Sequence, residues 1–461
     1  MCMDLKSIKK VYFIGIKGSG MVALAQNFKT RGIEVIGSDV SEKFFTDEVL
    51  KKAGILFKEN FSEENISSEE NIDLIVYSSA YDSTNPELKW AMENNIQSLN
   101  YAETLGEISK QKFTIAVCGT HGKTTVSAML AVAMKELGLD PTAIVGSKIN
   151  QLGTGAVTGK SDYFIIEADE YQNKFQYYHP SIVVLTSVDF DHPDYFENFE
   201  EYKEVFKAFI SKIPQHGFLV AWGGSVDVIE VAKSAKCNII FYDFFSAADS
   251  IYQLKDDFKK IGKDNVDFYT VPRGLSLQVP GQHNLLNASA VLSLSKKLKM
   301  NEEDVKKSLI NFKGTARRFE LVGETDAGAM VIDDYAHHPE EVRVTLKAAR
   351  EKYPEKNIIC VFKPHTFSRT EKLLGEFSQC FDNCDNLIIL DIFESAREEQ
   401  GTVTSADLVE KIKKFKRWTM HIPTNEEAYE YLKKEAGEND IIIAMGAGDT
   451  DELAKRLVEK N

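Results

Sequence analysis

The sequence predicts an α/β protein of three domains. Short apolar runs of strand length alternate with helix-like stretches along the chain, and such runs are typical of buried strands in parallel sheets. Several runs end in glycines or acidic residues, as expected at the carboxyl edge of an α/β sheet, where ligands bind. The length of 461 residues agrees with three domains of ordinary size.

The first predicted domain covers residues 1–110 and has the element order of a Rossmann-like sheet. An apolar strand at 11–16 is followed by glycines, a helix-like stretch and a second strand at 33–39. Further strands are expected at 71–79 and 96–100. Strand, tight turn, helix and strand in this order indicate a nucleotide-binding, doubly wound sheet.

The second predicted domain, 111–313, begins with another strand, loop and helix in a P-loop ATPase-like arrangement. The third, 314–461, is again Rossmann-like. The stretch 245–280 is charged and irregular, and no element is assigned there. The other strands expected in these two domains lie at 113–118, 163–169, 181–191 and 217–222, and then within 329–339, 357–364, 386–394 and 440–449.

The composition of the chain restricts which classes of molecule it is expected to bind and in which compartment it is expected to work. Acidic residues outnumber basic ones, 70 to 55, and the net charge of −15 predicts a poor general binder of nucleic acid or anionic membrane. Because no apolar run approaches about 18 residues and the start lacks a signal peptide's cleavage site, no membrane insertion is expected. The six scattered cysteines indicate a reduced, cytoplasmic setting. Cys380 and Cys384 are expected to be buried free thiols.

The strongest chemical motif is the loop GTHGKTT, from Gly119 to Thr125, between an apolar strand and an apolar helix. Backbone N–H groups of such a loop, together with the helix N-terminus, attract phosphate oxygens. Lys123 would reach the β- and γ-phosphates, and a threonine hydroxyl would ligate Mg²⁺. The usual spacing requires a glycine where Val117 stands. An ordinary strand–helix turn is the alternative interpretation.

This loop resembles the phosphate loop of the Mur ligase family, whose members use ATP to join an amino acid to a carboxylate. The resemblance extends over six ordered segments, from about residue 11 to Gly448. It implies that ATP binds at this loop, on Gly119, Thr120, His121, Gly122, Lys123, Thr124 and Thr125.

Acidic residues and a histidine at two strand ends imply a magnesium site. The segment EADEY ends one strand and DFDHPDYF ends the next, and carboxylates suit Mg²⁺. By resemblance, the ligands are Thr124, His192 and either Glu167 or Glu170, of which Glu170 is preferred. A solvated acidic loop is the alternative. Lys207 stands where several Mur ligases have a carbamylated lysine, but a solvated helix lysine is favoured.

Two further segments resemble ATP-binding parts of the family. The segment 280–288, PGQHNLLNA, opens a helix whose asparagine amides suit an adenine edge, with helix capping by Asn284 as the alternative. In 314–320, GTARRFE, Arg318 is chosen to clamp the transferring phosphoryl group, with an interdomain ion pair as the alternative. The implied ATP contacts here are His283, Asn284, Asn287, Arg318 and, for the ribose, Asp334, and the implied catalytic residues are Lys123, His192, Arg318 and His337.

The amino-acid site is implied by two segments that follow strands. In DDYAHHP, Tyr335 and His337 would lie near the incoming amino acid, although the histidine pair by itself would indicate surface or capping residues. The segment PHTFSRT resembles the alanine-adding branch of the family, where Arg369 suits the amino acid's carboxylate. Some members have a second arginine where this chain has Thr366, so the predicted contact depends on Arg369 alone.

The N-terminal glycines, GIKGSGM, nearly match a dinucleotide-binding motif, with Asp39 at the distance of a ribose-binding acid. They also resemble the family's segment for the UDP part of its substrate. Lys17 departs from both patterns and would either pair with a diphosphate or point to solvent. The implied UDP-sugar site comprises Gly15, Lys17, Gly18, Ser19, Gly20, Met21, Asp39 and Ser79.

The resemblance implies a ligase, monomeric or homodimeric, that uses ATP and Mg²⁺. It would join L-alanine to the lactyl carboxylate of UDP-N-acetylmuramate through an acyl phosphate. The expected partners are these small molecules, without nucleic acid. Three alternatives stay open: the ligase that attaches a whole tripeptide in murein recycling, a NAD-dependent oxidoreductase, and a non-catalytic nucleotide-sensing protein. Assays with L-alanine or a tripeptide, NAD binding and stimulated phosphate release would separate them.

Overall fold

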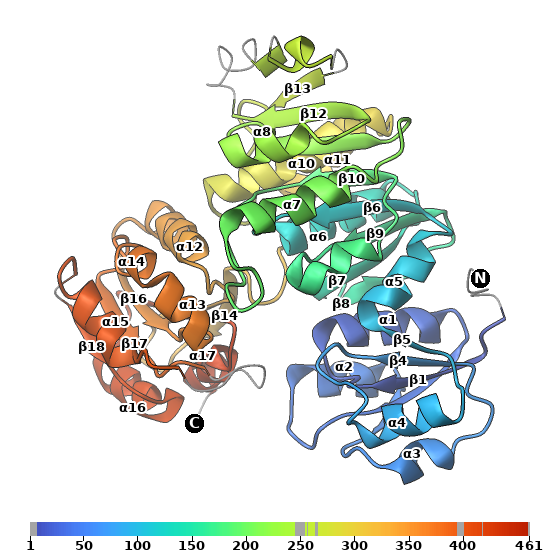
Figure 1. Cartoon of the computed structure of the whole chain (residues 1–461). Coiled ribbons are helices and arrows are strands. Elements are labelled where there is room, and N and C mark those ends of the chain that lie inside the picture. The colour runs from blue at the N-terminus through green and yellow to red at the C-terminus, as the bar shows by residue number, and fades with distance from the viewer. Residues whose placement is uncertain are drawn as a thin grey trace. The chain divides into compact units, whose positions relative to one another are not determined.

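A computed structural model describes residues 7–244, 254–255, 257–262, 266–393, 401–416 and 418–459. These residues form three sheets flanked by helices, which confirms the predicted α/β class (Figure 1). Each sheet lies inside the residue range predicted for one of the three domains. The boundaries of these domains stay a prediction. The chain divides into two compact units, called here unit 1 (1–188, 203–275 and 287–311) and unit 2 (189–202, 276–286 and 312–461).

The first sheet has five parallel strands in the order β3-β2-β1-β4-β5. Its central strand β1 ends at Ile14, and Gly15 then turns with a φ of 78°. A Cβ on Gly15 would lie 2.5 Å from the Tyr81 ring, so only glycine fits this turn into the first helix. The elements are β1 (Lys10–Ile14), α1 (Ser19–Thr30), β2 (Glu34–Ser38), α2 (Phe45–Lys52), β3 (Leu56–Lys58), α3 (Glu63–Ser67), β4 (Leu74–Tyr77), α4 (Pro86–Glu93), β5 (Ser98–Asn100) and α5 (Tyr101–Ser109).

The second sheet has eight strands in the order β13-β12-β11-β10-β6-β9-β7-β8, parallel except for the β7–β8 pair. The loop strand β6 lies between β10 and β9, so the carboxyl ends of all three meet at one edge. The elements are β6 (Phe113–Cys118), α6 (Lys123–Glu136), β7 (Thr142–Ile149), β8 (Thr154–Val157), β9 (Tyr163–Glu167), the 3₁₀ helix η1 (Tyr171–Gln176), β10 (Ile182–Leu185), α7 (Phe199–Ile210), β11 (Phe218–Trp222), α8 (Val226–Ala232), β12 (Asn238–Asp243), β13 (Val266–Thr270), α10 (Gln282–Lys297) and α11 (Glu302–Ile310).

Unit 1 contains both of these sheets because α1 of the first packs against β7 and β8 of the second. The Asn27 amide donates to the Thr158 hydroxyl at 3.0 Å, and the Thr154 hydroxyl donates to the Gln26 side chain at 3.0 Å. The unassigned stretch 245–280 contains β13, while residues 245–253, 256 and 263–265 lie outside the described part of the chain.

The third sheet has six strands in the order β14-β15-β19-β16-β17-β18, parallel except for β14. Apolar residues of α12 and α15 pack on one face, and those of α16 and α17 pack on the other. The elements are β14 (Glu320–Glu324), β15 (Met330–Asp334), α12 (Pro339–Lys352), β16 (Asn357–Phe362), α13 (Phe367–Lys372), α14 (Leu374–Phe377), β17 (Asn386–Ile389), α15 (Ser405–Ile412), β18 (Thr419–His421), α16 (Asn425–Glu435), β19 (Asp440–Met445) and α17 (Thr450–Val458).

Cys380 and Cys384 are buried free thiols in this third core, as predicted, and Cys360 lies with them. Cys2 lies outside the described residues. Within the part of the chain that the structure describes, no helix combines the length and apolar character that a membrane crossing demands.

Candidate active site

The loop between β6 and α6 has the conformation that its glycines predict. Gly119 and Gly122 have φ values of 131° and 82°, which side-chain-bearing residues rarely adopt. A Cβ on Gly119 would lie 2.2 Å from the Thr186 hydroxyl, and one on Gly122 would lie 2.7 Å from the Asn287 amide oxygen. Asn287, predicted from a segment far along the chain, therefore lies against the predicted phosphate loop.

Thr186 and Ser187 hold this loop in place, although the sequence analysis missed them. Strand β10 ends at Leu185, short of the predicted 191, because the next two side chains bond to the loop. The Thr186 hydroxyl donates to the carbonyls of Cys118, at 3.1 Å, and His121. The Ser187 hydroxyl accepts the His121 N–H at 2.9 Å. Two hydroxyl residues directly after a buried run are the signal that could have identified them.

Lys123, the first residue of α6, contacts the loop and one acidic side chain. Its ammonium donates to the carbonyls of Gly119, at 2.5 Å, and Thr120, at 3.2 Å. It also lies 3.1 Å from a carboxylate oxygen of Glu170. The Glu170 side chain is 1% exposed and that of Lys123 is 19% exposed. The carboxylate preferred as a metal ligand is thus paired with the predicted phosphate-binding cation.

Thr124 contacts the other candidate acid. Its hydroxyl donates to Glu167 at 3.1 Å, and the second carboxylate oxygen of Glu167 accepts the Gly146 N–H at 2.8 Å. Hydroxyl and carboxylate oxygens are hard ligands of the kind that Mg²⁺ prefers, so the donor set beside the loop fits this ion. His192 belongs to unit 2, and its role as a ligand stays a prediction.

Lys207 is a helix-surface lysine in α7, held between two acids. Its ammonium lies 2.9 Å from Glu204 and 2.8 Å from Glu230, and its side chain is 22% exposed. The hydrogen bonds that Lys207 donates to Glu230 and Glu204 raise its pKa. Carbamylation requires the neutral amine, which these two carboxylates disfavour.

Of the two alternatives for Lys17, pointing to solvent was wrong, and pairing with a diphosphate stays a prediction. Its side chain is 1% exposed, and the ammonium donates to the carbonyls of Val40, at 2.8 Å, and Glu42, at 2.6 Å. A third neighbour is the Asp47 carboxylate at 3.3 Å. Asp39 is buried and accepts the backbone N–H groups of Lys17, at 2.6 Å, and Val40, at 2.8 Å. Burial raises the pKa of Asp39 despite these bonds.

The other residues of the predicted UDP-sugar site lie around the start of α1. Gly18 precedes the helix, which begins at Ser19, and Met21 is buried. A Cβ on Gly20 would lie 2.7 Å from the Tyr101 ring, so this position needs glycine for close packing. Ser79 is exposed in the turn after β4. The binding role of these residues stays a prediction.

The two arginines before β14 differ in how firmly unit 2 holds them. Arg317 donates to the Gly446 carbonyl at 2.8 Å and to Thr450 at 3.1 Å, and its Nε lies 3.2 Å from Asp333. Arg318, the predicted phosphoryl clamp, is 30% exposed and lies 3.6 Å from Glu341. The side chain of Arg318 is therefore the more exposed of the two, at 30% against 15% for Arg317.

The DDYAHHP segment forms a buried polar cluster at the end of β15. Asp334 accepts the N–H groups of Phe319 at 2.7 Å and Ala336 at 2.9 Å, and burial raises its pKa. The His337 Nδ1 lies 3.0 Å from the Tyr335 carbonyl. Burial lowers the pKa of His337 to about 4, so the imidazole is neutral near pH 7.

Glu341 and His338 complete this part of the cluster. Glu341 lies 3.5 Å from the His337 ring and joins that histidine to Arg318. It stands inside α12, where sequence reasoning reads a solvated helix acid. His338 caps α12, as its alternative interpretation predicted, by accepting the Glu340 N–H at 3.3 Å. Its other ring nitrogen lies 3.3 Å from the Phe190 carbonyl.

Arg369 contacts an acid that the site prediction omitted. Its Nε and Nη2 lie 2.9 and 2.8 Å from Asp191, and the side chain is 5% exposed. Nη1 faces the His365 ring at 3.2 Å. Although burial opposes it, the Arg369 guanidinium holds the pKa of Asp191 well below its usual range. His192 is the next residue, with its Nε2 3.8 Å from Asp191.

The start of α10 carries the remaining ATP candidates. Gly281 turns with a φ of 98°, and a Cβ there would lie 2.5 Å from the His283 ring. Asn284 lies in the first turn of α10 and donates its amide to the Pro280 carbonyl at 2.6 Å. Residues 284 and 287 are both in this helix, as predicted.

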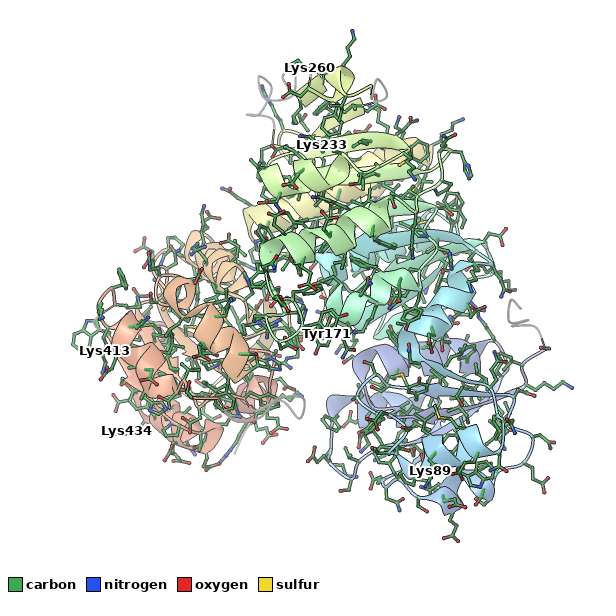
Figure 2. The ribbon with its side chains drawn as sticks, in the orientation of Figure 1. Lys89, Tyr171, Lys233, Lys260, Lys413 and Lys434 are labelled. Carbon is green, nitrogen blue, oxygen red and sulfur yellow. The ribbon has the colours of Figure 1, made fainter. Side chains whose placement is uncertain are left out.

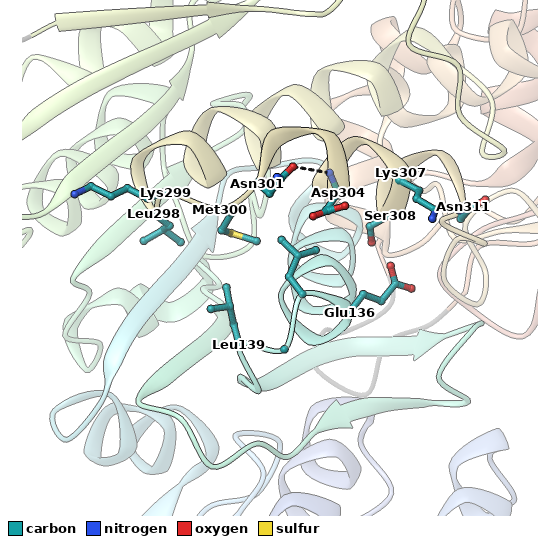
Figure 3. A pocket seen from close by; sticks show the side chains of 12 residues that line it. Glu136, Leu139, Leu298, Lys299, Met300, Asn301, Asp304, Lys307, Ser308 and Asn311 are labelled. Atoms are coloured by element: carbon teal, nitrogen blue, oxygen red, sulfur yellow. Dashed lines mark hydrogen bonds between the residues drawn. The ribbon is translucent and has the colours of Figure 1, made fainter.

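A cavity of about 780 Å³ opens in unit 1 at the far end of α6, away from the loop (Figure 3). It is lined by Glu136, the last residue of α6, and Leu139 just after that helix, and by Met300 before α11 and Asp304 and Lys307 within it. None of the predicted site residues lines it. Its position at the carboxyl end of α6 excludes it as the predicted phosphate site, which needs a helix N-terminus.

Comparison with known proteins identifies relatives over nearly the whole chain. Residues 10–113 match the "Mur ligase family, catalytic domain", residues 117–295 the "Mur ligase middle domain" and residues 317–448 the "Mur ligase, glutamate ligase domain". A protein of Desulfitobacterium hafniense, named UDP-N-acetylmuramate--L-alanine ligase, is 41% identical over 97% of this chain and 99% of its own. One of the same name from Caldanaerobacter subterraneus is 38% identical over 100% of both chains.

Solved structures show the same fold. The UDP-N-acetylmuramate-alanine ligase of Thermotoga maritima superposes with a TM-score of 0.74 at 23% identity, over 97% of this chain and 98% of that one. A murein peptide ligase of Psychrobacter arcticus gives 0.71 at 20% identity, over 97% and 98%.

Proposed function

This chain belongs to the Mur ligase family, and from that membership we propose that it joins L-alanine to UDP-N-acetylmuramate at the expense of ATP. The observation that carries this proposal is the phosphate loop with Lys123 at the head of α6, in a chain whose full-length relatives are named for that reaction. The products would be the amide, ADP and phosphate, in peptidoglycan precursor synthesis.

The first step would activate the lactyl carboxylate. A carboxylate oxygen attacks the γ-phosphorus of ATP, the bond to ADP breaks, and an acyl phosphate results. Lys123 and Arg318 would counter the charge that develops on the phosphoryl oxygens. The Gly119 and Gly122 turns let backbone N–H groups approach the phosphates without a side chain between.

Thr124, Glu167 or Glu170, and His192 would hold Mg²⁺. When bound there, Mg²⁺ would supply positive charge that neutralises part of the charge on the phosphate oxygens. Glu170 is buried and paired with Lys123, so it would also orient this ammonium before ATP arrives. Asn284, Asn287 and His283 would contact the base, and Asp334 the ribose.

The second step would form the amide. The amine of L-alanine attacks the acyl carbon, a tetrahedral intermediate forms, and the C–O bond to phosphate breaks as the amine loses a proton. His337 is suited to accept that proton because it is neutral near pH 7. Its Nδ1–H donates to the Tyr335 carbonyl, which leaves the Nε2 lone pair for the substrate. Arg369 would bind the alanine carboxylate through Nη1, the nitrogen that does not contact Asp191.

The UDP-sugar would bind at the start of α1, on the glycine turn and the residues around Asp39 and Ser79. Lys17 contributes there by fixing the chain after β2 through the carbonyls of Val40 and Glu42. We place the enzyme in the cytoplasm, where ATP is supplied and thiols such as Cys380 and Cys384 stay reduced.

Phosphate release from ATP, measured with UDP-N-acetylmuramate and a panel of amines, tests this function. We expect L-alanine to be the best substrate, with glycine and L-serine about 10- to 100-fold lower in kcat/KM, because small side chains differ by only ~1–3 kcal/mol in a pocket. A preference for the L-alanyl tripeptide would assign the chain to the recycling ligases instead. Release that is independent of any amine would contradict ligation altogether.

A further inference from the structure

The turn after α15 concentrates positive charge and aromatic surface on an acidic protein. Residues 411–418 read KIKKFKRW, with five basic residues and no acidic one, in a chain whose net charge is −15. Arg417 lies outside the described residues. The exposed members Lys411, Lys413, Lys414, Phe415 and Trp418 are called here the basic–aromatic patch.

The backbone beneath this patch is firmly anchored. The N–H groups of Phe415 and Lys416 donate to the Ile412 carbonyl at 2.9 and 2.8 Å, and the Trp418 carbonyl accepts the Leu387 N–H at 3.1 Å. Ile412 is fully buried in the third core. The side chains of the patch therefore project from a defined turn next to β18, the edge strand of the sheet. Figure 2 shows Lys413 extending outward there.

The packing of the core does not account for the two aromatic side chains. Phe415 is 60% exposed and Trp418 is 69% exposed, more than any other aromatic side chain among the described residues. Lysines at the end of a helix complement its dipole, which gives Lys411 and Lys413 a structural role. Lys416 differs from them because its ammonium donates to the Cys384 carbonyl. A dipole effect does not explain why two large aromatic side chains beside these charges are mostly exposed.

We propose that the basic–aromatic patch docks this protein reversibly on an anionic phospholipid surface. Lysines near such a surface each strengthen binding about fivefold, and Trp and Phe rings settle at the level of the headgroups. The rest of the acidic protein is repelled, so the patch determines which face approaches the lipid. The patch would be a local exception on a chain that is expected to be a poor general binder of anionic membranes, while the ligase reaction needs no lipid.

An acidic protein partner is the less favoured occupant. A stable protein interface usually takes about 20–30 residues from each side, and the patch offers five side chains. The indole of Trp418 is amphipathic, and such rings prefer the boundary between lipid and water. A few lysines with two rings are typical of marginal, reversible lipid docking rather than of a permanent complex.

The full-length protein can be tested with vesicles of phosphatidylcholine alone and of phosphatidylcholine with about 30% phosphatidylglycerol. We expect flotation with the anionic vesicles in ~20 mM salt and at least a tenfold loss in ~500 mM salt, where surface charges are screened. The Trp418 emission should shift to the blue on binding. The two other tryptophans, Trp90 and Trp222, are partly buried, so this shift reports on the patch.

Two variants and one matched control test whether the lysines and the aromatic side chains of the patch bind the vesicles. The pair K413Q/K414Q should weaken flotation and the blue shift about 10- to 30-fold, and F415S/W418S should abolish flotation. The control K433Q/K434Q removes the same charge from two exposed lysines of α16 in the same sheet domain and should change binding less than threefold. Unchanged thermal unfolding would show that all three variants fold.

Three outcomes would overturn the proposal: no flotation with either vesicle, equal flotation with both, or an equal loss in the control pair. Binding of a purified acidic protein in the absence of any vesicle binding would assign the patch to that class of partner instead and would also overturn it.

Discussion

Lys123 and Arg369 are both assigned to an anionic group of a substrate, and each contacts a buried carboxylate in the structure. Lys123 presents one ammonium to Glu170 at 3.1 Å and is 19% exposed. The Nε and Nη2 atoms of Arg369 both contact the Asp191 carboxylate, and the side chain is 5% exposed. An ammonium on a flexible stem can leave its partner for a phosphate, whereas a guanidinium held by two N–H groups is fixed in place. Lys123 is therefore called here the mobile cation, because its ammonium can leave Glu170 for a phosphate. Arg369 is called the fixed cation, because Asp191 holds its guanidinium in one position.

The largest effect is expected at the mobile cation. Lys123→Ala should lower amide formation about 10³-fold, because the charge on the transferring phosphoryl group loses its counter-charge. Binding of UDP-N-acetylmuramate, measured by calorimetry, should persist. Lys135→Ala, an exposed lysine in the last turn of the same helix, is the control and should stay within twofold. Near-normal turnover of the Lys123 variant would refute its catalytic role.

At the fixed cation, the main effect should be on stability. Asp191→Asn leaves the buried Arg369 charge without its counter-ion and should lower the free energy of unfolding of unit 2 by about 3 kcal/mol. Hydrogen exchange of the β16 and β19 amides measures this locally. The exposed neighbour Asp194, changed to Asn, should cost less than about 0.5 kcal/mol. Unchanged hydrogen exchange of these amides in Asp191→Asn would show that Asp191 does not hold Arg369 in place. The proposed difference between Arg369 and Lys123 would then be wrong.

A pH series separates the contributions of two buried groups of unit 2, His337 and Asp333, to its stability. His337 has a pKa lowered to about 4 by burial, so its contribution to stability is full above about pH 6.5 and is lost as pH falls toward 4. Burial raises the pKa of Asp333 to about 7 despite Arg317, so its contribution is full below pH 3.8 and is lost as pH rises through 7.

Between pH 7 and pH 5 these contributions change by about 2 kcal/mol each and with opposite sign. His337→Gln should therefore make unit 2 more stable at pH 5 than at pH 7, and Asp333→Asn should make it less stable. Hydrogen exchange of the third sheet at both pH values is the measurement. If the stability of unit 2 changed in the same way between pH 7 and pH 5 in both variants, other titratable groups would determine its pH dependence.

The smallest effect distinguishes the two glutamates beside the loop. Glu170→Gln should raise the Mg²⁺ concentration needed for half-maximal phosphate release about tenfold, since it removes a proposed ligand and the partner of Lys123. Glu167→Gln is the matched variant, because it changes only the acid bonded to Thr124 and Gly146. A larger effect in Glu167→Gln would move the ligand assignment to that residue.

Local sequence patterns were enough to predict most of the strands and helices and the phosphate-binding character of the site. The run FTIAVC before GTHGKTT predicts a buried strand, a phosphate loop and a helix, and β6 and α6 are found there. Short strands such as β3 and the Thr186 and Ser187 hydroxyls escaped prediction, because their roles depend on neighbours that the local sequence does not contain. Glu341 reads as an ordinary surface acid until α12 brings it beside Arg318 and His337.

By itself, the sequence determined the alternation of strands and helices, the glycine turns and the cations at strand ends, because these follow from residues adjacent in the chain. Only the tertiary structure decided their partners. The order β10-β6-β9 places Thr186 and Glu167 on either side of the loop. Asp191 meets Arg369 from 178 residues away, and Lys17 is buried by the chain that follows β2. Such pairings depend on which strands become neighbours, which a local pattern does not record.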